Sequence, residues 1–236
     1  SPSYKQANLS IEGVSPVITN SVFEYAGKYG VTLSYASSTV SNNIFRNNKN
    51  NVFSCGLSVN VSAPTVSDNT FSGNRRGLCL SSTAGDILNN TFTNNINDAI
   101  TSTHRFAGRL LGNTGSGNGK NGISFIGELT KRGDALTLEK NDLPYLVVDD
   151  TNVSASSTLT MSPYTIIKFG DRFLRILGSF IVPGPALFTS VYDDSDGNDA
   201  LNDGPIPAGI GGLQEIRLES GSSSDIKDAE FRYFKY

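Results

Sequence analysis

The chain has 236 residues, with 19 Lys and Arg against 22 Asp and Glu and a formal net charge of -3. This balance argues against a dedicated binder of nucleic acid, because such proteins carry a basic stripe. No apolar run reaches the length of a membrane span, so we expect no membrane insertion. A single His leaves little material for metal or triad chemistry based on imidazole.

An internal repeat dominates the chain from about residue 15 to residue 127. In four segments one Asn follows another by five positions, and the leading residues are Asn43, Asn69, Asn90 and Asn113. These leading residues follow one another at steps of 26, 21 and 23 residues. A second pattern drifts by similar amounts, and its members are Gly30, Gly56, Gly77, Ala99 and Gly122. Two patterns that move together indicate a structural repeat of about 22 residues.

Each repeat unit holds short apolar-polar-apolar runs separated by Gly and Asn, which is typical of strands joined by turns. A helix-free unit of this length predicts one coil of a β-solenoid, stacked on the next at roughly 4.8 Å. Equivalent side chains then form inward columns, one aliphatic (Val31, Leu57, Leu78, Ile100, Ile123) and one aromatic (Phe23, Phe45, Phe71, Phe92). Asn suits the turns, because it tolerates a left-handed backbone and its amide can bond to the next coil. The Gly column indicates a corner with positive φ or no room for a Cβ.

On these motifs the segment from about 15 to 127 resembles the right-handed parallel β-helix repeats of secreted polysaccharide-acting enzymes and bacterial surface proteins. Asn90-Thr91-Phe92-Thr93-Asn94-Asn95 shows the turn signature of that repeat, and Gly122-Ile123-Ser124-Phe125 shows its strand. The resemblance implies an all-β fold, a right-handed parallel β-helix (β-solenoid). It implies an architecture and no particular activity.

The signature fades over residues 128–236, although strand-like runs continue. Leu136 and Leu159 are 23 residues apart, so the period persists with different turns. The stretch from 136 to 233 resembles a block of large bacterial extracellular repeat proteins, on Leu143–Val148, Ser157–Met161 and Ile166–Gly170, except that Met161–Tyr164 replaces a usual Pro-Gly turn. We therefore expect residues 1–236 to form a single β-helix domain with a loop excursion near 190–212.

That excursion contains an acidic segment that could hold a cation. Asp194, Asp196 and Asn198 occupy the first, third and fifth positions of a calcium-binding loop, with Asp193, Asp199 and Asp203 nearby. Calcium takes six to eight oxygen ligands from such a turning backbone. The hypothesis is a structural, non-catalytic Ca²⁺ site, and the alternative is a solvated acidic turn.

Two basic groups are further candidates for sites. His104, Arg105 and Arg109 could contact a uronic-acid polymer, but the carboxylates of a lyase or hydrolase do not accompany them, so a lone surface histidine is the favoured interpretation. The pair Arg75–Arg76 is expected to be solvated. We predict no catalytic residue.

A row of outward side chains is expected on one strand face: Thr32, Ser58, Cys79, Thr101 and Ser124. Such a row can bind ice or crystalline polysaccharide, but uniform Thr spacing and a row of aromatic rings are missing. Plain solvent-facing strand surface is the default interpretation.

Cys55 and Cys79 lie 24 residues apart, on adjacent coils, but at different positions relative to their glycines. An offset of about three residues along an extended strand exceeds the reach of a disulfide, unless the coil of 26 residues bulges. We therefore predict two free thiols.

The leading functional hypothesis is a non-catalytic module of a secreted or cell-surface protein, a rigid stalk or adhesion surface that contacts a polysaccharide or cell-surface glycan. One alternative is a polysaccharide lyase or glycoside hydrolase. A second is an extracellular filament subunit that self-associates end to end through the aromatic residues 231–236.

Overall fold

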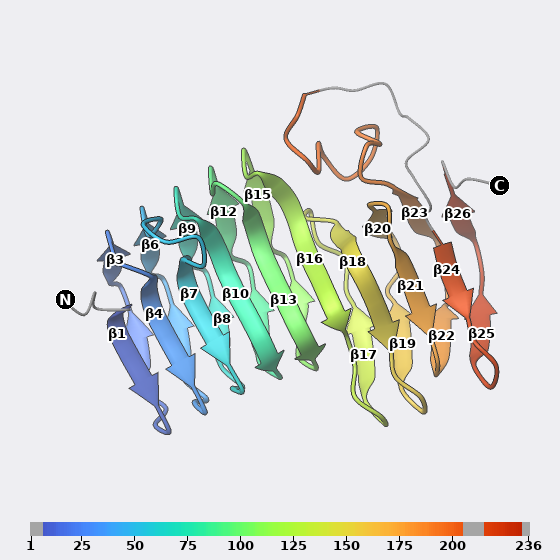
Figure 1. Ribbon diagram of the computed structural model, residues 1–236, viewed down its shortest axis with the longest axis horizontal. Helices are drawn as coiled ribbons and strands as arrows, with labels where there is room; N and C mark the ends of the chain where they lie inside the picture. The colour runs from blue at the N-terminus through green and yellow to red at the C-terminus, as the bar shows by residue number, and fades with distance from the viewer. Residues whose placement is uncertain (1–6, 205–214, 233–236) are drawn as a thin grey trace.

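The computed structural model describes residues 7–204 and 215–232, and within them it contains 26 β-strands and no helix. The strands wind into coils that follow one another along the long axis of the molecule, with β1 (Ala7–Glu12) and β26 (Ala229–Phe231) at opposite ends (Figure 1). The strand pairings of these residues are parallel and join successive coils. This arrangement confirms the predicted parallel β-solenoid.

One long sheet runs the length of the solenoid. Its order is β1 (Ala7–Glu12), β4 (Tyr29–Ser34), β7 (Cys55–Asn60), β10 (Arg76–Thr83), β13 (Asp98–Phe106), β16 (Lys120–Glu128), β18 (Tyr145–Val153), β20 (Thr165–Phe169), β23 (Ala186–Ser190) and β26 (Ala229–Phe231). Off this path, β21 (Phe173–Ile176) pairs with β18 and with β24 (Glu215–Leu218). The aliphatic column of the repeat, from Val31 to Ile123, is therefore carried on this one continuous sheet.

Two shorter sheets complete the coils of the first half. One contains β2 (Val17–Thr19), β5 (Thr39–Ser41), β8 (Thr65–Ser67), β11 (Asp86–Leu88) and β14 (Leu110–Leu111). The other contains β3 (Val22–Glu24), β6 (Ile44–Arg46), β9 (Thr70–Ser72), β12 (Thr91–Thr93) and β15 (Thr114–Ser116). A fourth sheet replaces both in the second half, with β17 (Ala135–Leu138), β19 (Thr158–Met161), β22 (Ser179–Val182) and β25 (Ser223–Ile226).

The core is built from the predicted columns. Leu57 pairs in register with Leu78, and every member of the aliphatic column is fully buried. In the aromatic column the rings of Phe45, Phe71 and Phe92 stack face to face with centroids 4.8 Å apart. The column ends where Gly115 pairs with Phe92.

Two ladders of buried Asn side chains hold the turns. The Asn48 amide donates to Asn74 Oδ1 at 3.0 Å, and the Asn74 amide to Asn95 Oδ1 at 3.1 Å. The second ladder runs through Asn43, Asn69, Asn90 and Asn113. The left-handed backbone falls on the preceding residue, as at Asn42 and Asn47, with φ of 56° and 57°. The amide ladder is therefore confirmed, whereas the left-handed conformation belongs to the neighbours.

The glycine column follows from lack of space. A Cβ on Gly77 would lie 2.6 Å from the Phe92 ring and 2.5 Å from the Ala99 carbonyl oxygen. Gly77 itself does not have a positive φ. Of the two explanations offered for the column, close approach is the right one for Gly77.

The coil period continues into the second half, where Leu136 pairs with Leu159 as predicted. The chain leaves the coils after β23, and residues 191–204 pass over the outward face of the long sheet, where Ala200 packs on Leu146. Positions 205–214 of the expected excursion lie outside the described residues. So do residues 233–236 of the aromatic end, although Phe231 is described and stacks on Phe188 at 4.8 Å.

Candidate functional site

A groove of about 290 Å³ crosses the outward face of the long sheet over β7, β10 and β13. On the side where these strands begin it is lined by apolar groups: Tyr29, Phe53 and the paired sulfurs of Cys55 and Cys79. Further along the strands it is lined by hydroxyl side chains: Ser58, Ser81, Thr101 and Thr103. The groove is therefore amphipathic across its width.

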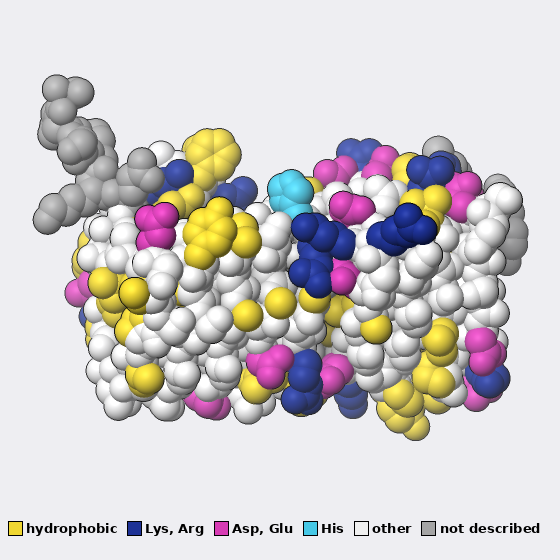
Figure 2. Space-filling view, turned by 90° about the horizontal axis from the view of Figure 1, so that it is seen from below, with side chains coloured by type: hydrophobic (Ala, Val, Ile, Leu, Met, Phe, Trp, Pro, Cys, Tyr) yellow, Lys and Arg dark blue, Asp and Glu magenta, His cyan; other side chains and the backbone are white. Residues whose placement is uncertain are grey.

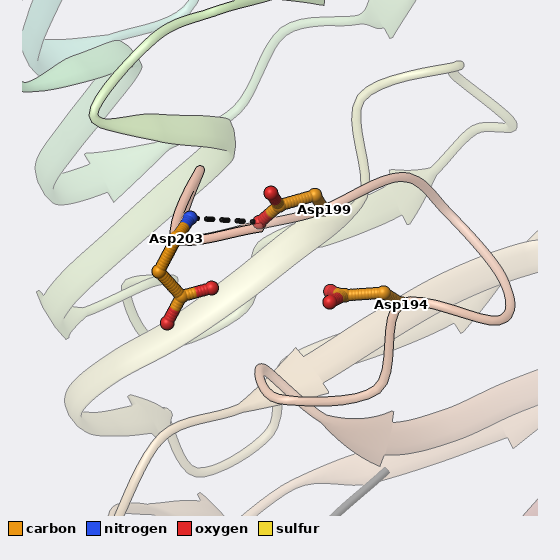
Figure 3. A group of neighbouring side chains, drawn as sticks. All are labelled: Asp194, Asp199 and Asp203. Atoms are coloured by element: carbon orange, nitrogen blue, oxygen red, sulfur yellow. Dashed lines mark hydrogen bonds between the residues drawn. The ribbon is translucent and has the colours of Figure 1, made fainter. Parts of the chain in front are cut away.

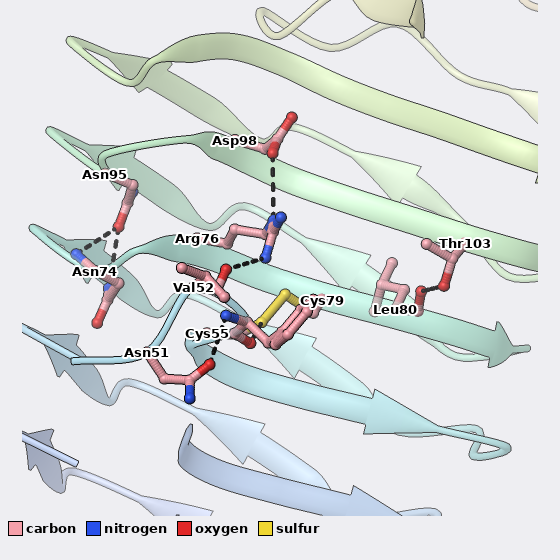
Figure 4. Close-up of a disulfide and its surroundings, with 11 residues drawn as sticks. Asn51, Val52, Cys55, Asn74, Arg76, Cys79, Leu80, Asn95, Asp98 and Thr103 are labelled. Atoms are coloured by element: carbon pink, nitrogen blue, oxygen red, sulfur yellow. Dashed lines mark hydrogen bonds and ion pairs between the residues drawn. A yellow bond between two sulfur atoms is a disulfide. The ribbon is translucent and has the colours of Figure 1, made fainter. Parts of the chain in front are cut away.

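The apolar wall comes from an insertion in one coil. The coil between the Asn43 and Asn69 turns is longer than its neighbours, and the extra residues form a loop that exposes Val52 (57%) and Phe53 (63%). Within the loop the Phe53 amide donates to Asn51 Oδ1 at 2.8 Å. Arg76 reaches across from the next coil and donates to the Val52 carbonyl at 3.1 Å (Figure 4). These bonds give the exposed apolar residues a defined position.

Thr101 lies in the groove with its hydroxyl unused. The residue is 6% exposed, and its Oγ1 has no hydrogen-bond partner among the residues that the structure describes. Thr103, two residues on, instead donates to the Leu80 carbonyl at 3.2 Å. A buried polar group normally has a partner, so a molecule or water that entered the groove and moved the neighbouring side chains aside would satisfy the buried Thr101 hydroxyl.

A buried carboxylate organises the charged edge of the groove. Asp98 is 5% exposed and lies between two cations, with Lys120 Nζ 3.1 Å and Arg76 Nε 3.5 Å from its oxygens. The Ser124 hydroxyl donates to it at 2.8 Å. The prediction that Arg76 is solvated is wrong, because Asp98 and the Val52 carbonyl both bind its guanidinium. One carboxylate against two cations leaves this edge with an excess of positive charge.

The prediction of two free thiols is also wrong, because Cys55 and Cys79 form a disulfide with their Cα atoms 6.1 Å apart. The offset between the two residues is as expected, since Cys55 pairs with Arg76 and Cys79 with Ser58. The strand β7 is not fully extended, however, because Cα atoms with this offset lie only 6.1 Å apart. Gly56 and Leu57 are consecutive and both buried, so the strand bends there and brings the outward positions on either side together.

The acidic segment gathers only some of the residues predicted for a cation. Asp194, Asp199 and Asp203 bring one carboxylate oxygen each to within 4.8 Å of one another (Figure 3). The amide of Asp203 donates to Asp199 Oδ1 at 3.3 Å. Asp196 turns away and pairs with Arg232 at 2.5 Å. The group offers three carboxylates to a hard cation such as Ca²⁺.

Asp193 and Asn198 have structural partners instead. Asp193 is fully buried, and its carboxylate accepts from the Thr189 hydroxyl at 2.6 Å and from the Ser195 amide at 3.1 Å. Burial alone would raise the pKa of Asp193, but these hydrogen bonds outweigh it and hold the pKa below its usual value. The Asn198 amide donates to the Asp142 carbonyl at 3.3 Å.

His104 lies at an exposed position in β13, with a left-handed φ of 63°. Figure 2 shows it beside a group of basic side chains interspersed with acidic ones. Arg105 pairs with Asp134 at 2.6 Å and Arg109 with Glu139 at 3.1 Å, so each guanidinium has its own carboxylate. The bond from Arg105 holds the pKa of Asp134 below its usual value. The exposed position agrees with a lone surface histidine.

Residues 4–143 match the family described as the right handed beta helix region, and the chain belongs to that family. No curated protein and no solved structure matches the chain. The family defines the repeat architecture that the register and the stacked columns display. Within residues 7–204 and 215–232 we find no helical segment with the length and hydrophobicity of a membrane span.

The groove is the part of the site that sequence reasoning missed. The outward row was predicted, and Ser58, Cys79 and Thr101 do align in register. What the prediction left out was the long coil. The spacing of 26 residues between its turns indicates an insertion next to that row. An insertion carrying two apolar residues beside a row of hydroxyls is the signal that could have found the groove.

Proposed function

We propose that this chain is a non-catalytic β-helix module of an extracellular protein, and that it contacts a glycan through the groove over β7, β10 and β13. The observation that carries the proposal is the buried, unpartnered hydroxyl of Thr101 opposite an apolar wall, within the residues described. Ligand sites combine apolar surface with a few convergent polar groups in this way.

A pyranose ring fits the two sides of this groove. Its C–H face can pack on an aromatic ring, and Phe53 and Tyr29 both line the groove. Its hydroxyl groups exchange hydrogen bonds with side chains that both donate and accept, as Thr101 and Ser58 can. Arg76 adds a guanidinium at the edge, which suits a sugar carboxylate or ring oxygen.

The scaffold suits a rigid stalk or adhesion surface. Parallel pairing, ring stacking and amide ladders link successive coils, so the groove rests on rigid strands. The disulfide supports an oxidising, extracellular location, where such bonds persist. Calcium held by Asp194, Asp199 and Asp203 would stiffen the loop at 191–204.

The test is binding to immobilised cello-, xylo-, chito- and galacturono-oligosaccharides, followed by calorimetry with those that bind. We expect Thr101→Val to weaken binding at least fivefold without loss of thermal stability, because it removes a hydroxyl that has no partner in the described fold. Phe53→Ala should weaken it by a similar factor. Thr137→Val, at an exposed position on β17, is the control. If the panel does not bind, or if Thr101→Val binds normally, the proposal is wrong.

A second candidate function is favoured by one observation, the buried Asp98 between Arg76 and Lys120. The two cations would attract the charged groups of an anionic polysaccharide, and the carboxylate between them would be the acid or base of an enzyme that cleaves it. Incubation with polygalacturonate and with alginate, followed by assays for reducing ends and unsaturated products, distinguishes the two candidates. Activity that Asp98→Asn abolishes would replace the non-catalytic proposal.

A further inference from the structure

We propose that the Cys55–Cys79 disulfide is a positioning element of the groove: it fixes the inserted loop 49–54 so that Phe53 stands as the apolar wall, and its reduction releases that wall while the coils stay folded. The glycan part of this inference rests on the proposed function. The positioning part stands on the geometry alone.

The loop is fastened at its two ends. Before it, Asn48 belongs to the buried ladder, where its backbone amide donates to Asn74 Oδ1 at 3.1 Å. After it, Cys55 opens β7 two residues beyond Phe53 and is joined covalently to the next coil. Between these ends, Arg76 donates from its guanidinium to the Val52 carbonyl at 3.1 Å and from its backbone amide to the Ser54 carbonyl at 3.2 Å. The Asn50 side-chain amide donates to the Ala26 carbonyl of the preceding coil at 3.3 Å. The disulfide is thus the covalent fastening nearest to Phe53.

The coils themselves have other means of staying paired. Leu57 and Leu78 remain in register through backbone bonds, and both are fully buried. Phe45 and Phe71 stack in the same two coils at 4.8 Å. Loss of the disulfide therefore removes the covalent fastening of the loop and leaves these interactions between the coils in place.

The disulfide can be reached from the groove through Cys79, which is partly exposed and lines it. Cys55 is only 2% exposed. A dithiol reductant attacks one sulfur, the S–S bond breaks, and a second exchange leaves two protein thiols and the oxidised reductant. Two electrons and two protons pass to the protein. A phosphine reductant gives the same two thiols, with phosphine and water becoming phosphine oxide.

The experiment compares the oxidised protein, the phosphine-reduced protein and the variant C55A/C79V, which replaces the pair with apolar side chains. Hydrogen exchange is measured in peptides covering residues 50–55 and, as an internal control, 86–93. We expect exchange in the first peptide to rise at least tenfold in both the phosphine-reduced protein and the variant, with exchange in the second peptide unchanged. Unchanged protection of residues 50–55 in both samples would overturn the positioning role. A matched rise in both peptides would overturn it too, because the bond would then hold the whole fold.

A double-mutant cycle tests the link to binding, with the oligosaccharide that binds best as the probe. We expect C55A/C79V to lower affinity about as much as Phe53→Ala, and to lower it no further when Phe53→Ala is already present. Additive losses would show that the disulfide acts on binding by another route. If the oligosaccharide panel fails to bind the wild-type protein, the proposed function falls, and hydrogen exchange still decides whether the disulfide positions the loop.

Discussion

The ammonium group of Lys168 lies 2.7 Å from the backbone carbonyl oxygen of Asn198 and donates a hydrogen bond to it. The same group also donates to the Asp193 carbonyl, and Lys168 is fully buried beneath the acidic loop. Burial lowers the pKa of Lys168, and the carboxylates around it, Asp193 first, act in the opposite direction. A side-chain cation from β20 thus organises the inner side of a loop whose outer side carries the acidic group.

We predict that Lys168→Met destabilises the folded position of the loop at 191–204. Methionine keeps the length and apolar stem of the side chain, but it leaves two backbone carbonyls without their donor. The free energy of unfolding should fall by roughly 2 kcal/mol, as for the loss of a charged hydrogen bond, and hydrogen exchange in residues 191–203 should accelerate. Lys49→Met, at an exposed position, should change neither quantity. Normal protection of the loop in Lys168→Met would show that its packing on Leu146 suffices.

We predict that calcium raises the melting temperature of the protein, because a ligand that binds only the folded state stabilises it. Asp194, Asp199 and Asp203 would hold the ion, since their carboxylates converge. Millimolar Ca²⁺ should raise the melting temperature by a few degrees in calorimetry, EDTA should reverse the shift, and Asp199→Asn with Asp203→Asn should abolish it. Asp196→Asn should preserve the shift, because Asp196 pairs with Arg232 instead. A melting temperature that does not change when calcium is added would contradict the proposed calcium site.

The repeat was predictable because stacking imposes the same demand on every coil. Phe45, Phe71 and Phe92 occupy equivalent positions in successive coils. The same residue type therefore recurs in the sequence, and the register of the coils follows from its spacing. The Asn ladders follow the same logic. Regularity of this kind is what sequence patterns record.

The groove departs from that regularity, and for this reason the sequence did not predict it. The distance between Cys55 and Cys79 depends on a bend at two consecutive buried residues, which a period-two strand pattern does not describe. Likewise, the group formed by Asp194, Asp199 and Asp203 depends on the path of the loop over Leu146 rather than on its spacing in sequence. Tertiary contacts decide both cases, and no local pattern contains them.

We predict an acid-dependent contribution from the pair Arg105–Asp134. The pKa of Asp134 in the folded protein is below its ordinary value of 3.8, because Arg105 binds its carboxylate. The pair therefore stabilises the fold above that ordinary value, and its contribution disappears as pH falls through the lowered pKa. At pH 6 Asp134→Asn should cost about 1 kcal/mol or less, since Arg105 is partly exposed.

Urea titrations of wild type and Asp134→Asn between pH 2 and pH 6 check this expectation. The difference in unfolding free energy should be constant at the upper end and should shrink below pH 3.8. Asp149→Asn, at an exposed position, is the matched control and should show no such loss. A difference that persists unchanged at the lowest pH would mean that the substitution harms packing at this position, and the ion pair would then not explain the effect.

We predict that Asn74→Leu is among the most destabilising single changes in the first half of the chain. The Asn74 side chain accepts from the Asn48 backbone amide at 3.1 Å and donates to the Phe45 carbonyl at 2.8 Å, and both contacts are buried. Leucine has nearly the same size but leaves these groups without partners, so urea titration should show a loss of about 3 kcal/mol. Asn60→Ala, at an exposed position, should stay within about 0.5 kcal/mol of wild type. A comparably small change in Asn74→Leu would mean that ring stacking and strand pairing hold the coils without the ladder.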